Sequence, residues 1–294
     1  MNIIKPTITI FLITFSSLIF AQNSNYIEYY RNVEKAISKG VFSENNDSTI
    51  YYLNIAFNKA EPYPEDLLII SKALYNNGNK DKAYKFLIKS LEKGIDTASI
   101  RKIEILPFLN KTEISQLEAK YINYKIECDT ILFHQLDSVI KLDQSVRQFD
   151  WSDTTSITFK SSLKKMNIQD SLNRVWILNT IKEKGWMGRK LIGNDRISFI
   201  LLLHIHKEWF EKHSDILKKE IIKGNLNPSY LAGTLDRANF GTGNFKYASF
   251  LPGNMPIKED TEEMKNNRFK IGALSTRVFF YRGQFRFQEC KIHN

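Results

Sequence analysis

The spacing of apolar residues predicts helices over most of the chain. Apolar side chains recur every three or four positions through residues 26–40, an interval that places them on one face of a helix. Residues 65–94 give the clearest helical hairpin, because a turn at Gly78 separates two apolar faces. Small residues at Ser71 and Ala83 should let these two helices approach closely.

This hairpin is similar to a tetratricopeptide repeat. The likeness rests on the Gly78 turn, on Ala83 and on the spacing from there to Leu87 and Ser90. Stacked repeats bury their faces against neighbours, so the single clear copy implies helical partners on both sides, within a repeat-like region over 22–126. The resemblance implies binding of a peptide or protein; a purely structural role is the alternative.

A change of composition near residue 127 predicts a domain boundary, and residues 127–294 form a second helical domain. The predicted helices cover residues 131–147, 168–184, 195–224, 229–239 and 257–274, and residues 151–162 read as a polar loop. Apolar and basic residues alternate over 277–287 about Gly283, which predicts a small C-terminal β-hairpin. The expected fold class is therefore mainly α, with a helical-repeat-like N-terminal region and a helical C-terminal domain ending in that hairpin.

Residues 1–21 have the pattern of a signal peptide. Lys5 precedes an apolar run over 8–20, and Ala21 offers a small residue at the cleavage point. The run is shorter than the roughly 20 residues of a bilayer span, so no stable membrane anchor is expected after cleavage. We therefore expect an exported protein, periplasmic or secreted. In an oxidising compartment Cys128 and Cys290 could pair, and two unpaired buried thiols are the alternative.

The net charge of +10 favours anionic partners in general. Lysines nevertheless alternate with acidic residues along helical stretches such as 207–223, whereas a nucleic-acid footprint gathers on one face. The expected partner is another protein or a peptide, with a small anionic ligand as the alternative and no nucleic acid.

Two acid–base pairs and one histidine are the candidate chemistry. His204 ends the apolar block 197–203, and Asp143 shares a helix face with Arg147 at i, i+4. If these groups meet, carboxylates could orient the imidazole and guanidinium groups could hold an anion; the alternative is an ion-pair network that fixes helix register. The catalytic candidates are His204, Asp143 and Asp236, and the ligand-binding candidates are Gln144, Arg147, Arg237 and Tyr247.

The sequence predicts neither a metal nor a cofactor. His204 and Glu208 stand at i, i+4 but have no evident third ligand. The chain contains no Gly-x-Ser-x-Gly elbow, P-loop, His-Glu-x-x-His or dinucleotide glycine fingerprint, so the commonest hydrolases, NTPases, zinc proteases and nicotinamide enzymes are not leading candidates. Whether the protein is an enzyme stays open.

Several motifs follow one another in a fixed order along residues 130–275. They are Asp143-Gln144-x-x-Arg147, Gly185-Trp186, a loop at Gly193, His204 after an apolar block, Asp236-Arg237 and Tyr247-Ala248-Ser249. This order resembles the bacterial domain of unknown function 6624 family. The chain departs from that pattern at Met187, Phe245 and Phe250, where the family has a proline and two glutamines. The resemblance implies positions and no activity. The favoured interpretation is an interaction or scaffold module; the alternative is an enzyme or a small-ligand binder.

Overall fold

A computed structural model describes residues 25–95, 109–121, 128–149, 152, 154–195, 197–238, 246–247 and 261–283. The helices of these residues are α2 (Tyr26–Lys35), η1 (Ala36–Gly40), η2 (Val41–Ser43), α3 (Asn46–Phe57), α4 (Pro64–Asn76), α5 (Lys80–Glu92), α7 (Lys111–Tyr121), α8 (Thr130–Ser145), α9 (Ile157–Lys184), α10 (Arg189–Ile192), α11 (Ile197–Leu202), α12 (Lys207–Lys212), α13 (Ser214–Ile222), α14 (Pro228–Ala238), α15 (Glu262–Ile271) and α16 (Thr276–Gly283). The mainly α class is confirmed. The predicted signal peptide and the predicted boundary near residue 127 lie outside the described residues.

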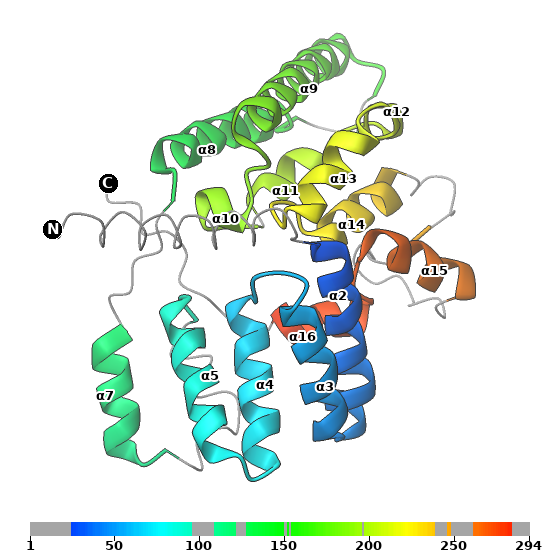
Figure 1. Ribbon diagram of the computed structural model, residues 1–294. Helices are drawn as coiled ribbons and strands as arrows, with labels where there is room; N and C mark the ends of the chain where they lie inside the picture. Colours follow the sequence, from blue (N-terminus) through cyan, green and yellow to red (C-terminus); the bar gives the residue numbers. More distant parts are fainter. Residues whose placement is uncertain are drawn as a thin grey trace, which may run out of the picture.

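Helices α4 and α5 form the predicted hairpin, beside α3 in Figure 1. Pro64 opens α4 at a position that needs no backbone N–H, and the Asn79 side chain caps α5 by accepting from the Lys82 N–H at 3.3 Å. The Ser71 hydroxyl donates to the Ala83 carbonyl oxygen at 2.7 Å, so the small residues bring the helices together as expected. The likeness to a tetratricopeptide repeat stays a prediction.

The predicted β-hairpin is wrong in the part that the structure describes. Residues 276–283 form helix α16 instead, and residues 284–287 lie outside the described ranges. Val278 and Arg282 are four positions apart, and both are buried. Helical geometry puts them on one face, where Val278 joins the N-terminal core with Leu274. The short aromatic run of this segment is compatible with a strand or a helix. Burial of the face that carries Val278 and Arg282 favours the helix.

A second core joins α8, α9, α10, α11 and α13 around the buried Trp186 and Met187, and Ile27 of α2 also packs into it. The predicted continuous helix over 195–224 is wrong, because the chain turns after α11 and again at His213. The Asn194 side chain accepts from the Ile197 N–H at 3.1 Å.

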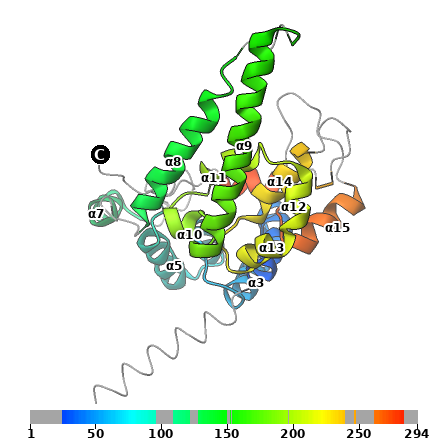
Figure 2. The same cartoon turned by 90° about the horizontal axis from the view of Figure 1, so that it is seen from above.

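Helices α8 and α9 form an arm, drawn in green in Figures 1 and 2, and the first half of α9 projects beyond the other helices in Figure 2. Ser156 caps α9 by accepting from the Phe159 N–H at 3.1 Å, so the helix starts inside the predicted polar loop. Among the described residues, no helix has both the length and the apolar character needed to cross a membrane.

Candidate functional site

The structure brings Asp143, Arg147 and His204 together. Arg147 donates from Nη2 to Asp143 Oδ1 at 2.8 Å and from Nε to Oδ2 at 3.2 Å, which confirms the predicted i, i+4 pair. The Nε2 atom of His204 lies 3.6 Å from Asp143 Oδ2. His204 reaches this point because α11 packs on α8 and the chain turns immediately after α11.

Further polar groups complete this cluster, which we call the arm cluster. Asp143 is fully buried and accepts from Gln144 Nε2 at 2.7 Å and from Asn173 Nδ2 at 2.9 Å. Arg147 also pairs with Asp170. Asp170 and Asn173 stand on the inward face of α9, and the sequence analysis missed both. The sequence does indicate them, because two polar residues three positions apart share a helix face with the apolar Ile177.

The arm cluster holds a neutral imidazole at neutral pH. Burial lowers the pKa of His204, and the charge of Arg147 lowers it further, whereas Asp143 raises it without prevailing. Both carboxylate oxygens of Asp143 already accept hydrogen bonds, from Gln144, Arg147 and Asn173. The guanidinium group of Arg147 faces two carboxylates, so the cluster carries no excess positive charge.

Asp236 and Tyr247 belong to a separate arrangement. Asp236 is fully buried, and its Oδ1 accepts from the backbone N–H groups of Lys246 at 2.7 Å and Tyr247 at 2.8 Å. Arg268 donates to the Tyr247 carbonyl oxygen. Arg237 is exposed, and its charge makes a small contribution to the lowered pKa of His204. Asp236 therefore positions backbone, a role that the sequence analysis did not foresee.

A third cluster joins the N-terminal helices to the rest of the chain; we call it the junction cluster. Arg282 of α16 donates from Nε to Asp66 Oδ1 at 2.9 Å and from Nη2 to Asp66 Oδ2 at 2.7 Å. Its Nη2 also donates to Glu65 Oε1 at 2.9 Å. Arg189 of α10 donates from Nη1 to both Glu65 oxygens at 3.1 and 2.9 Å. The Tyr29 hydroxyl adds a bond of 2.6 Å to Asp66.

The junction cluster is closed to solvent by aromatic rings. Glu65, Asp66 and Arg282 are all buried, and the Arg282 guanidinium carbon lies 5.5 Å from the ring centroid of Tyr30 and 5.8 Å from that of Tyr63. Burial alone would raise the pKa of Glu65, but the two arginines outweigh it and hold that pKa below its ordinary value. The carboxylate of Glu65 thus stays charged and serves to hold helices together.

Among the residues that the structure describes, no three His, Cys, Asp or Glu side chains lie in an arrangement that could hold a metal ion. Searches of protein-family models, curated proteins and solved structures find no match to this chain.

Proposed function

We propose that the protein is an exported helical interaction module that binds another protein. One observation carries this proposal: exposed aliphatic side chains gather on the arm. These residues, with their exposed fractions, are Ile131 (69%), Leu142 (56%), Ile157 (87%), Ile168 (52%), Leu172 (57%) and Val175 (59%). Soluble monomers seldom leave apolar side chains grouped in this way unless the surface binds something.

The mutual pairing of the charged groups in the arm cluster supports the same proposal. Its carboxylates and its arginine satisfy one another, which is the arrangement expected of a network that fixes the register of α8 against α9. Export is supported by the pattern of residues 1–21 and by Cys128, which is disulfide-bonded, since disulfides persist in oxidising compartments. The other cysteine of the chain, Cys290, lies outside the described residues.

The alternative is a binder of small anions, or an enzyme, at the arm cluster. Its specific support is that the side chains of His204 and Arg147 keep 20% and 15% exposure, so a solute can reach one edge of the cluster. Against it stands the charge balance, because Asp143 and Asp170 already neutralise Arg147.

Two measurements on the mature full-length protein separate the two functions. Chemical crosslinking in the periplasmic fraction, followed by mass spectrometry and purification through the identified partner, should recover a complex that His204→Ala leaves intact. A thermal-shift screen against anionic metabolites and glycans should show no shift that depends on His204. The proposal is refuted by a ligand-induced shift that His204→Ala abolishes, in the absence of any reciprocally purified protein partner.

A further inference from the structure

We propose that the outward face of α9 is a docking surface for an acidic, amphipathic helix of a partner protein. This inference rests on the proposed function and specifies its surface and partner chemistry. We call the surface the arm face; it comprises Ile157, Lys160, Lys164, Ile168, Leu172 and Val175.

Helical geometry separates the arm face from the buried side of α9. The buried side carries Asp170, Asn173 and Ile177, whose spacings of three and four residues keep them in one line. Ile168 and Leu172 are also four apart, but they lie on the opposite side of the same helix, where they are more than half exposed. A helix that buries one side and exposes apolar residues on the other can contact two neighbours, and the described chain supplies α8 on the buried side.

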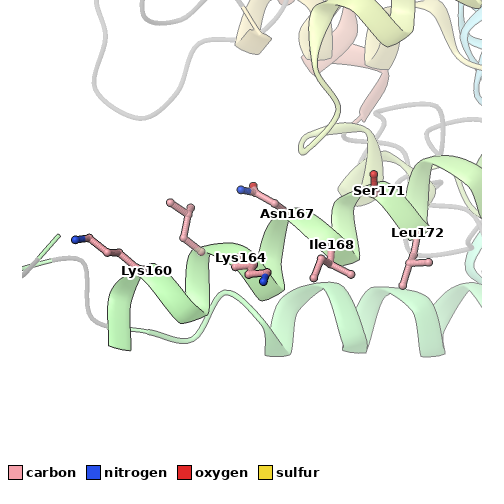
Figure 3. A pocket seen from close by; sticks show the side chains of 7 residues that line it. Lys160, Lys164, Asn167, Ile168, Ser171 and Leu172 are labelled. Carbon is pink, nitrogen blue, oxygen red and sulfur yellow. The ribbon is translucent and has the colours of Figure 1, made fainter. Parts of the chain in front are cut away.

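A shallow, open depression runs along the arm face. Figure 3 shows Ile168 and Leu172 beside Lys164, with Lys160 toward the start of the helix. Amphipathic helices bind such surfaces through apolar anchors at i, i+3, i+4 and i+7. Ile168, Leu172 and Val175 follow this spacing themselves, so they match a partner helix with the same repeat.

Charge identifies the partner as acidic. From Ile157 to Ile181, α9 carries four basic residues and one acidic residue, the basic ones being Lys160, Lys164, Lys165 and Arg174. The acidic residue, Asp170, is buried and paired with Arg147, so it offsets none of this surface charge. A helix with glutamate or aspartate flanking its apolar stripe therefore complements the arm face.

Two other occupants fit the arm face less well. A second copy of the chain would set lysines against lysines, and like charges in contact oppose association. A membrane surface would suit the basic charge, but helices that lie in membrane interfaces carry Trp, Phe or Leu on their apolar side, whereas the arm face has one leucine and no aromatic side chain.

The test uses two designed peptides of about 21 residues, roughly six helical turns, measured by fluorescence anisotropy against the mature full-length protein. Both peptides share one leucine stripe; glutamates flank it in the first and lysines in the second. The glutamate peptide should bind at least about tenfold more tightly, and this preference should shrink as NaCl concentration rises. The double variant Lys160→Glu/Lys164→Glu should reverse the preference, and Ile168→Asp/Leu172→Asp should abolish binding.

The matched control is Lys218→Glu/Lys219→Glu, which reverses two exposed lysines on α13 and should leave binding unchanged. Circular dichroism confirms that each variant is folded. Four results would each overturn the inference: binding of neither peptide, equal binding of both, binding of phosphatidylglycerol vesicles alone, or a homodimer that Ile168→Asp/Leu172→Asp dissociates. If the peptides fail while crosslinking still recovers a protein partner, only the arm face is refuted; if no partner is recovered either, the proposed function falls with it.

Discussion

Replacing Arg282 by methionine should destabilise the fold severely. The side chain donates three charge-assisted hydrogen bonds, at 2.7 to 2.9 Å, to the carboxylates of Glu65 and Asp66. Methionine preserves much of the volume but leaves Asp66 charged, buried and without its guanidinium partner. Removing one member of a buried ion pair costs about 3–5 kcal/mol, a large share of the about 5–15 kcal/mol that holds a typical domain together. Urea unfolding followed by circular dichroism measures the loss.

Arg277→Met is the matched control on the same helix. Arg277 is exposed, and its guanidinium carbon lies 3.9 Å from the ring centroid of Phe42, so its removal should cost at most about 1 kcal/mol.

The pH dependence of stability supplies a second criterion for Arg282→Met. Burial already raises the pKa of Asp66 in the wild type although Arg282 lowers it, and burial also opposes the lowering of the Glu65 pKa by Arg189 and Arg282. Arg282→Met removes the lowering by Arg282, so the folded-state pKa values of both carboxyl groups rise. The variant therefore loses stability relative to wild type as pH rises through those values, and recovers it as pH falls toward about 4. Equal losses in the two variants, or an Arg282→Met loss unchanged between pH 5 and pH 7.5, would refute the role of the junction cluster.

Two further predictions concern the imidazole and the backbone. Because burial and Arg147 lower the pKa of His204, its proton NMR titration midpoint should lie below about 6.5. The neutral form then stabilises the fold above that pH and the contribution is lost as pH falls through the midpoint; a higher midpoint would indicate an ion pair instead. Gly224→Ala should cost about 2–5 kcal/mol, because φ is +74° and the new Cβ would lie 2.4 Å from the Tyr26 ring. Gly78→Ala, with φ at +79° and open space around it, should cost only about 1–2 kcal/mol in the same urea experiment.

Local geometry explains which parts of the arm cluster could be predicted. Asp143 and Arg147 are four residues apart on one helix, so the sequence alone brings them together. His204 is recognisable in the sequence because it ends an apolar block, although the block is a short helix followed by a turn. The roles of Asp170 and Asn173 are not recognisable there, because their partners lie 23 to 30 positions earlier, on another helix.

The junction cluster shows a stronger limit of sequence reasoning. Arg282 meets Asp66 across 216 positions, and Arg189 meets Glu65 across 124. In the sequence, Glu65 and Asp66 resemble ordinary acidic residues in a helix's first turn, where the dipole favours them. Separation along the sequence also explains why the predicted β-hairpin is wrong. The contacts of Val278 and Arg282 with residues far away in the sequence favour a helix instead.

Two features depart from the usual burial of apolar residues and exposure of charged ones. The junction cluster buries charged side chains, and the arm face exposes aliphatic ones. Buried ion pairs such as Arg282 with Asp66 give weak net stability but leave one permitted arrangement of helices, since any displacement strands a charge in an apolar interior. Exposed Ile168 and Leu172 fix nothing within the described chain, because they lie on the side of α9 away from its buried residues. Where apolar residues are exposed or charged residues are buried and no internal contact explains it, the residues often have a function. The buried charges are therefore accounted for by the fold, whereas the arm face needs a partner to account for it.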